Sequence, residues 1–389
     1  MFRIISILIF IIFSTAYAQP DSLWSRTYGN RYRQWCYSAA LTSDGGYILA
    51  GRVDFQNGSD FMAVKTDDNG EEIWSITCGG ERADIGEDVV ECPGGGFLIS
   101  GWTDSFGHNA WLVKLSEDGD SLWSRVYGEG GEELDPIIAC SDGGYAIGGS
   151  TYTYTVGGSY DFWLVKIDEE GDIEWHNSYG GRGSDFCRNL IQTDDGGYAL
   201  GGETRSFGAG PKDFFLVKTD SDGEEEWHRN YGHRGLDECY DLIQTMDGGF
   251  ALTGYSDSLG GNGEDLALVK TDAEGNQQWV ETYGSIRGLD AGFSILQRED
   301  GGYVIGGRGY TFENYRDMLI IRTNCWGEEL WFQTYGAREF EECYDMIATD
   351  DGGYILAGFG QENHFNSFML LKTGMDFLTH LPPEFHLSL

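Results

Sequence analysis

Acidic side chains recur along this chain about every fifty residues, and several have an arginine three positions before them. The acids are Asp84, Glu132, Asp185, Asp237, Asp290 and Glu341. The arginines are Arg182, Arg234, Arg287 and Arg338. A ring of carboxylates holds a cation or a polar ligand, and guanidinium groups bind carboxylates and other anions. The repetition in nearly every copy favours a structural contact made once per copy, with ligand binding as the alternative.

Short acidic turns resemble parts of calcium-binding loops. Two examples are Asp220-Ser221-Asp222-Gly223 and Asp67-Asp68-Asn69-Gly70. A complete calcium loop needs more oxygen ligands at alternating positions and a bidentate acid further on. We interpret these segments as hairpin turns in which Asp and Asn accept local backbone bonds and Gly takes a positive φ. No metal site is predicted.

No segment has the spacing of a known catalytic motif. A Gly-x-Ser-x-Gly segment is missing from the sequence, and its seven His residues lack metal-ligand spacings. A catalytic site in a repetitive chain must break the repetition, whereas these acids and arginines follow it. A carboxylate pair assembled from different repeats is the one enzymatic option that remains. We predict no catalytic residue and no cofactor.

Aromatic residues that depart from the repeat are candidates for ligand binding, because exposed rings stack on sugars or anchor protein partners. Ser105-Phe106-Gly107 and Ser206-Phe207-Gly208 recur at one loop position, which favours packing for those rings. The aromatic candidates for ligand binding are Tyr152, Tyr154, Tyr310 and Tyr315. Arg182, Arg234, Arg287 and Arg338 complete the predicted ligand-binding set.

These residues belong to a unit that repeats along most of the chain. Its landmark is Trp-x-x-x-Tyr-Gly, which begins at Trp24, Trp123, Trp175, Trp227, Trp279 and Trp331. In the copy at Trp74, Cys78 replaces the Tyr. An Asp-Gly-Gly segment and a basic residue that closes an apolar run keep step with the Trp. A period near fifty with short strand-like runs is typical of a propeller blade rather than a helical solenoid.

Each unit divides into four strands, here called A to D. In one copy they are Cys239–Gln244, Gly249–Gly254, Asp265–Thr271 and Gln277–Tyr283. The first Trp precedes the first A strand, and the last copy has no Trp after its C strand. We therefore expect Asp21–Tyr28 to form the outer strand of the last blade and to close the ring. The predicted fold is all-β, a single seven-bladed β-propeller of four-stranded antiparallel blades.

Loop length varies on one face of this expected ring. The distance from the basic residue of strand C to the next Trp is constant, whereas the B-to-C connection ranges from eight positions after Gly101 to twelve after Gly149. The B-to-C and D-to-A loops lie on the same rim. Variable loops on a rigid scaffold are the usual place for binding, so we predict that this rim binds a glycan or a protein.

The predicted location of the protein is extracellular. Arg3 precedes a largely apolar run over residues 4–13, and Ala16-Tyr17-Ala18 offers a cleavage site, so residues 1–18 are predicted to be a signal peptide. The expected propeller covers 19–373, and 374–389 form a tail. No later segment is apolar enough for membrane insertion. A formal net charge of -39 argues against nucleic acid as a partner, and we expect a secreted or cell-surface monomer.

The eight cysteines do not have the spacing of a disulfide framework. Cys36, Cys187, Cys239 and Cys343 occupy the same inner-strand site in different copies. Equivalent points of neighbouring blades are normally further apart than the roughly 7 Å Cα separation that a disulfide tolerates. We interpret these cysteines as small packing residues.

Two repeat segments resemble the repeats of secreted bacterial propeller proteins grouped with quinoprotein-like propellers. They are residues 213–227, which run from Asp213 to Trp227, and residues 195–202, which begin Asp-Gly-Gly. The resemblance covers about residues 21–373 and implies the fold. Quinone-cofactor dehydrogenases of the related class use adjacent cysteines, which this chain lacks, so the cofactor is not carried over. The tail at 381–389 resembles the lead-in to a type IX secretion sorting domain.

Two functional hypotheses follow. The first is a non-catalytic binding or adhesion propeller that presents its variable rim to glycan or extracellular protein. The second is an extracellular carbohydrate-active or quinoprotein-like enzyme. Two converging carboxylates without counterparts in the other blades would favour the enzyme, and a shallow aromatic face would favour the binding module.

Overall fold

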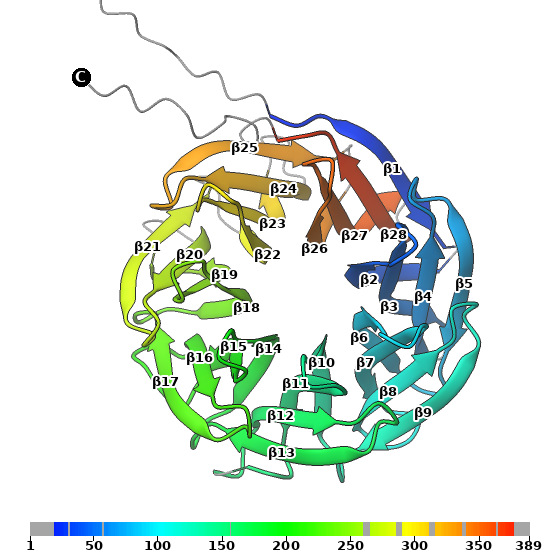
Figure 1. Cartoon of the computed structure of the whole chain (residues 1–389), viewed down its shortest axis with the longest axis horizontal. Helices are drawn as coiled ribbons and strands as arrows, with labels where there is room; N and C mark the ends of the chain where they lie inside the picture. The colour runs from blue at the N-terminus through cyan, green and yellow to red at the C-terminus, as the bar shows by residue number, and fades with distance from the viewer. Residues whose placement is uncertain are drawn as a thin grey trace, which may run out of the picture.

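The computed structural model describes residues 19–29, 32–56, 58–155, 157–259, 265–284, 290–310, 316–336, 340–362 and 365–376. Within these residues the chain is all-β, and 28 strands form seven four-stranded antiparallel sheets. The sheets are arranged as blades around a central axis (Figure 1). The prediction of a seven-bladed β-propeller is confirmed. The described residues contain no helix that could cross a membrane.

The four strands of each blade run from the centre outward. Blade 1 contains β2 (Arg33–Leu41), β3 (Tyr47–Phe55), β4 (Gly58–Thr66) and β5 (Glu72–Cys78). Blade 2 contains β6 (Asp84–Glu91), β7 (Phe97–Thr103), β8 (Asn109–Leu115) and β9 (Ser121–Tyr127). Blade 3 contains β10 (Glu132–Ala139), β11 (Tyr145–Thr151), β12 (Asp161–Ile167) and β13 (Ile173–Tyr179). Blade 4 contains β14 (Asp185–Gln192), β15 (Tyr198–Thr204), β16 (Asp213–Thr219) and β17 (Glu225–Tyr231).

The remaining blades follow the same order. Blade 5 contains β18 (Asp237–Gln244), β19 (Phe250–Ser256), β20 (Asp265–Thr271) and β21 (Gln277–Tyr283). Blade 6 contains β22 (Ala291–Gln297), β23 (Tyr303–Tyr310), β24 (Arg316–Thr323) and β25 (Glu329–Tyr335). Blade 7 contains β26 (Glu341–Ala348), β27 (Tyr354–Glu362), β28 (Phe365–Thr373) and, on its outside, β1 (Ser22–Tyr28).

The ring closes as predicted. β1 pairs antiparallel with β28, from Ser22 opposite Thr373 to Tyr28 opposite Phe368. The first and last strands of the chain therefore lie side by side (Figure 1). Closure gives β28 a partner along its outer edge, and a free strand edge is a liability for aggregation.

In five blades the Tyr of the Trp-x-x-x-Tyr-Gly motif connects the blade to a Gly of the next one. In blade 4, the Tyr231 hydroxyl donates to the carbonyl of Gly275 in the C-to-D turn of blade 5, at 2.8 Å. The Trp227 ring lies against the same glycine, where an added Cβ would approach the ring to 2.6 Å. Gly275 also has a φ of 76°, which side chains other than glycine rarely adopt. The motif therefore requires Trp, Tyr and the neighbouring blade's Gly together.

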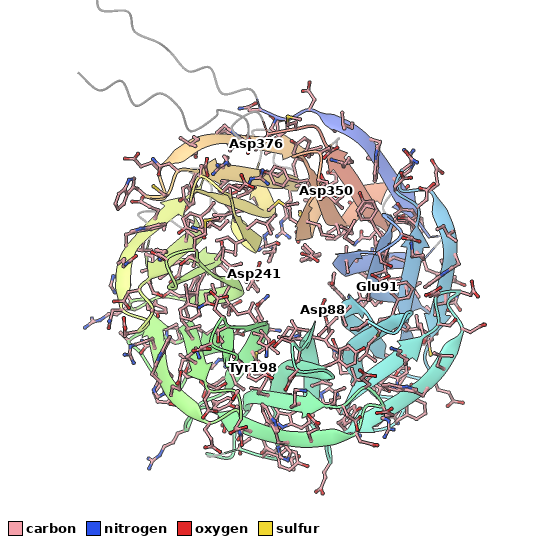
Figure 2. All side chains as sticks on the ribbon, in the orientation of Figure 1. Asp88, Glu91, Tyr198, Asp241, Asp350 and Asp376 are labelled. Atoms are coloured by element: carbon pink, nitrogen blue, oxygen red, sulfur yellow. The ribbon has the colours of Figure 1, made fainter. Side chains whose placement is uncertain are left out.

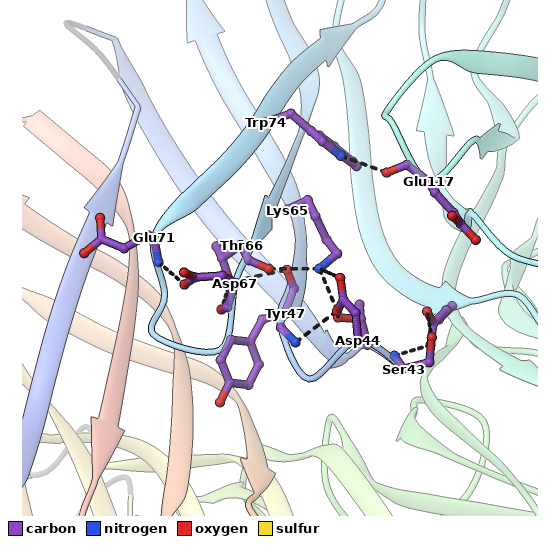
Figure 3. A network of polar contacts seen from close by, with 12 residues as sticks. Ser43, Asp44, Tyr47, Lys65, Thr66, Asp67, Glu71, Trp74 and Glu117 are labelled. Atoms are coloured by element: carbon purple, nitrogen blue, oxygen red, sulfur yellow. Dashed lines mark hydrogen bonds and ion pairs between the residues drawn. The ribbon is translucent and has the colours of Figure 1, made fainter.

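In five blades the landmark lysine of strand C pairs with the Asp of its own blade's Asp-Gly-Gly turn and fixes the base of that blade. Lys65 is buried, and its ammonium lies 2.9 Å from Asp44 Oδ2 of the Asp-Gly-Gly turn and donates to the Thr66 carbonyl (Figure 3). Hydrogen bonds from Thr42 and Lys65 lower the pKa of Asp44 to about 2. In blade 6, Arg322 replaces the lysine and reaches both Asp300 and Asp376. Constant base turns are therefore structural.

The repeating acid ties the D-to-A loop of each blade to its B-to-C loop. Asp185 is buried and accepts hydrogen bonds from Gly181 N at 2.9 Å and from the Thr204 and Ser206 hydroxyls at 2.5 and 2.6 Å. Asp84 and Asp237 make the corresponding contacts. These contacts are of the structural kind that the repetition favours. The partners are backbone amides and hydroxyl groups.

Candidate functional site

The innermost strands line a central cavity, and it is here that the repeat breaks down. Each innermost strand has a β-bulge at or next to the third residue after the repeating acid, or after the residue that replaces it. Bulges re-aim side chains and are common beside functional sites. The residues at this position are Tyr37, Glu87, Asp135, Arg188, Tyr240, Phe293 and Tyr344, and all seven line a cavity of about 530 Å³.

One side of this cavity is an aromatic arc. Its central rings are Tyr240, Phe293 and Tyr344, with centroids 4.9 Å apart for the first pair and 5.1 Å for the second. Tyr344 continues the contact to Tyr37 at 5.6 Å. Four blades, the fifth, sixth, seventh and first, supply these rings. We call these four residues the aromatic arc.

The opposite side of the cavity is charged. Glu87 accepts a hydrogen bond from Trp102 Nε1 at 3.2 Å, and Asp135 in the next blade lies 3.4 Å from Arg188 Nη1. Arg188 also donates twice to the Glu203 carboxylate, at 3.3 Å each. Burial raises the pKa of Glu87 and of Asp135, and the Asp135 charge raises that of Glu87 further. Glu87 and Asp135 occupy the same repeat position in adjacent blades, and the other five blades have no carboxylate there.

A layer of carboxyl groups one residue further along the strands joins neighbouring blades. Asp88 accepts from the Ser38 hydroxyl of blade 1 at 2.5 Å and from Ile137 N of blade 3 at 2.8 Å. Asp241 accepts from Asn189 Nδ2 at 2.6 Å and from Ile295 N at 2.7 Å. Both residues lie at the inner edge of the ring (Figure 2). Burial raises the pKa of Asp88 to about 6 and that of Asp241 to about 8.

Asp345 of blade 7 is the third carboxyl group of this layer, and it joins blades 6 and 1. It accepts from Ala39 N at 3.0 Å and from the Ser294 hydroxyl at 3.4 Å. At the junction of blades 3 and 4 the equivalent position is Pro136, and the described residues use other contacts there. These are the Asp135–Arg188 ion pair and a bond from Cys187 N to the Ser150 hydroxyl at 3.3 Å.

The far end of the cavity is aliphatic. Ile138, Ile191, Ile243 and Leu296 line it two residues beyond the carboxyl layer. The cavity therefore changes from aromatic and charged side chains to hydrogen-bonded carboxyl groups and then to an apolar end. A few convergent polar groups among apolar and aromatic side chains are the usual lining of a small-molecule site.

At the mouth of the channel, on the face of the variable loops, neighbouring blades contact each other through pairs of side chains. The residue before or at the start of strand C contacts the next blade's strand A. The pairs are His108 with Glu133 at 3.4 Å, Tyr160 with Phe186 at 5.3 Å between centroids, Lys212 with Glu238, and Arg316 with Glu342 at 2.8 Å. Each pair is complementary, so the mouth is held together by contacts that differ from blade to blade.

The structure places two of the predicted aromatic residues at this mouth. Tyr152 is exposed, and its ring lies 5.5 Å from that of Tyr160, which contacts Phe186 on the channel wall. Tyr310 accepts a hydrogen bond from Arg316 Nε at 3.1 Å. Whether either residue binds a ligand stays a prediction.

Tyr154 has a different environment, and the interpretation of this residue as irregular is wrong. It follows Thr151 as Phe207 follows Thr204, and the backbone amides of Tyr154 and Phe207 donate to those hydroxyls at 3.2 Å. Tyr154 stacks on Trp163 at 5.8 Å, as Phe207 stacks on Phe215 at 5.3 Å. The longer loop of blade 3 begins only after this position, which hid the equivalence.

The predicted arginines Arg182 and Arg234 lie in D-to-A loops and are exposed. Arg287, Arg338 and Tyr315 lie outside the described residues, as do the predicted signal peptide and residues 377–389 of the tail. Among the described residues, no group of three or more His, Cys, Asp or Glu side chains is placed to hold a metal ion. Whether the predicted ligand-binding residues form one site stays a prediction.

The cavity residues themselves were missed by the sequence reasoning, although a signal existed. The third position after the repeating acid holds Tyr, Glu, Asp, Arg, Tyr, Phe and Tyr in the seven copies. The positions directly before and after it vary less, with Cys, Gly or Leu before it and Ser, Asp, Asn or Pro after it. Variation between two such positions marks a side chain that does not pack in a blade.

No family model and no curated protein matches this chain. Among solved structures, a protein of unknown function from Dyadobacter fermentans DSM 18053 is similar with a TM-score of 0.56 at 10% identity, over 92% of this chain and 99% of that one. Sqt1 from Chaetomium thermophilum, bound to the N-terminus of ribosomal protein L10, has a TM-score of 0.55 at 10% identity, over 92% and 100%. Puromycin hydrolase has a TM-score of 0.55 at 11% identity, over 89% of this chain and 52% of that one. Similarity at this level shows the propeller fold alone, and the quinoprotein-like grouping and the secretion tail stay predictions.

Proposed function

We propose that this protein is a carbohydrate-binding propeller that acts outside the cell or at its surface and holds its ligand in the central cavity. The observation that supports this most is the aromatic arc facing Glu87, Asp135 and Arg188 across a cavity of about 530 Å³. Aromatic rings cover the apolar faces of sugar rings, while carboxylates and guanidinium groups pair with their hydroxyls.

The size of the cavity favours a short glycan over a protein partner. Small-molecule sites occupy roughly 300–1,000 Å³, whereas protein interfaces bury about 800 Å² on each partner. This moves the proposed site from the loop tips of the rim to the channel that the rim surrounds. Tyr152 and Tyr310 then border the entrance.

The test is binding of a panel of mono- to tetrasaccharides by the full chain, followed by calorimetry on the best ligand. Phe293→Ala removes the centre of the aromatic arc and should weaken binding by at least about tenfold, roughly 1.4 kcal/mol. Phe332→Ala, an aromatic truncation on the exposed face of β25, is the matched control. Equal affinities for the two variants would place the ligand elsewhere.

A carbohydrate-active enzyme is a second candidate, because Glu87 and Asp135 are a carboxyl pair that no other blade repeats. Acid and base carboxyl groups on either side of a glycosidic bond are the usual machinery of sugar hydrolysis. Incubation of each bound glycan with the protein and with Glu87→Gln separates the two candidates. Release of new reducing ends by the wild type alone would support the enzyme, and intact glycans would support the binding module.

A further inference from the structure

We propose that the ligand of the central cavity is an amino sugar, with its ammonium group toward the carboxyl side and its ring against the aromatic arc. This inference rests on the proposed carbohydrate-binding function and specifies the charge of the substrate. Two independent properties of the cavity support it: an excess of acidic groups, and aromatic rings on the opposite wall.

The lining residues are unbalanced in charge. The acidic residues in the lining are Glu87, Asp88, Asp135, Asp241 and Asp345, whereas Arg188 is the one basic residue among the described lining residues. Arg188 is already shared between Asp135 and Glu203. The other four acids therefore have no cation from the protein in the cavity, and an ammonium group supplies one.

The raised pKa values of two of these acids agree with the excess of acidic groups in the cavity. Burial raises the pKa of Asp88 and Asp241, and each lies in the field of Asp345. Buried carboxyl groups shift in this direction when no opposite charge compensates them. A bound cation lowers the cost of ionising them, so ligand and carboxylates stabilise each other.

The aromatic arc selects an organic cation over a metal ion. Rings attract cations through their faces within about 6 Å, and this attraction suits a substituted ammonium group with a carbon skeleton. A metal ion instead requires several oxygen ligands converging at about 2–2.6 Å. The described acids show no such grouping, and Asp88 and Asp241 are occupied with backbone and side-chain donors of neighbouring blades.

The experiment compares the glucosamine disaccharide with its N-acetylated counterpart, which has the same ring framework without the charge. At pH 6 the free amine is protonated, because amino groups of this kind have a pKa near 8. We expect the charged disaccharide to bind the wild type at least about tenfold more tightly. Glu87→Gln should remove most of that preference, because it weakens binding of the charged disaccharide more than binding of the acetylated one.

The matched control is Glu91→Gln, which makes the same change on the same strand, at the end remote from the repeating acid. Glu91 accepts from Ser43 there and does not line the cavity (Figure 2). The control should keep the preference for the amine. If it loses the preference as Glu87→Gln does, general charge rather than the cavity explains the selectivity.

The wild-type comparison alone already tests the inference if a variant does not fold. Equal affinity for the two disaccharides, or tighter binding of the acetylated one, overturns the amino-sugar proposal and leaves carbohydrate binding standing. Binding of other neutral glycans but neither disaccharide has the same meaning. No binding of any glycan in the panel overturns the proposed function itself.

Discussion

At the scale of single residues, a residue that departs from the repeat marks a position whose contacts differ from those in the other blades. Arg322 is the best example, since six blades have a lysine at its position. In blade 6 this side chain meets Asp300 in the turn and the fully buried Asp376 after the last strand. The lysines that have a second carboxylate partner, Lys166 and Lys218, meet a half-exposed Glu of strand D instead. A guanidinium has enough donors for both, and an ammonium at the same place does not reach them equally. The exception therefore follows from Asp376.

Replacing Arg322 with Lys should destabilise the protein by about 1–3 kcal/mol, because buried polar partners are left without a donor. In combination with Asp376→Asn, the additional loss should be smaller than the sum of the single effects, since both changes disturb one network. Urea unfolding of the three variants measures this. Strict additivity would show that Asp376 is not the reason for the arginine.

Asp241 predicts a dependence of stability on pH. Its carboxyl group faces Asn189 on β14, Ile295 N on β22 and, at longer range, the charges of Asp345 and Asp88. Burial raises its pKa to about 8, so between pH 4 and 8 the folded protein holds a proton that the unfolded chain has lost. Stability should therefore fall as pH rises through this window.

The expected loss from Asp241 is about 1–2 kcal/mol between pH 5 and 8, discounted for its partial exposure to the channel. Asp241→Asn mimics the protonated side chain and should flatten the slope. The side-chain amide oxygen of Asn189 is buried and has no hydrogen-bond partner among the described residues. Rotation of the Asn189 amide presents this oxygen to the amino group of the new Asn. Melting temperatures of the wild type and the variant at pH 5 and pH 8 measure this pH dependence. An equal drop in melting temperature for both proteins would exclude Asp241 as the cause of the pH dependence.

At the scale of strands and turns, each motif of the sequence is a contact between two elements. The Trp and Tyr of the outer strand hold the C-to-D turn of the next blade, and the lysine of strand C holds the A-to-B turn of its own blade. The acidic turns behave as predicted, since Asp220 Oδ1 accepts from the amides of Asp222 and Glu224. The strands and turns could therefore be predicted from the spacing of these motifs in the sequence.

Tyr231→Phe should cost about 0.5–1.5 kcal/mol, the usual net value of one hydrogen bond. The ring still fills its site, so the change isolates the bond to Gly275. Phe332→Ala on an exposed strand face is a control that should stay within about 0.5 kcal/mol. Chemical denaturation measures both. A cost below that of the control would show that the hydroxyl does not connect the blades.

At the scale of the whole molecule, closure was predictable and the cavity was not. The offset between Trp24 and the last strand C, which ends near Lys372, predicts the pairing of β1 with β28, and the structure confirms it. Glu87 and Asp135 occupy one repeat position in different copies, and ring closure and the bulges bring them to one cavity. Spacing along a strand reports packing within a blade, whereas the channel depends on seven blades at once.

Trp24→Ala should destabilise the whole ring by about 3–5 kcal/mol, as large-to-small changes at packed aromatic residues do. Leu23→Ala is the control beside it, because Leu23 is 61% exposed. Calorimetry should show a lower melting temperature for the first variant and almost none of that change for the second. Similar transitions for both would mean that β1 contributes little to closure.

The pairing of β1 with β28 also sets a time for folding. β1 is made first and its partner strand last, so at about 5–20 residues per second the N-terminal segment waits on the order of tens of seconds for its place in blade 7. During this interval β1 has no partner strand, and its native contacts are limited to those of Trp24 and Tyr28 with blade 1, such as Tyr47 and Gly70. Blades 1 to 6, by contrast, contain all four of their strands in consecutive order. Completion of the ring is therefore necessarily a late event, and the aggregation risk of this chain is concentrated at its beginning and its end.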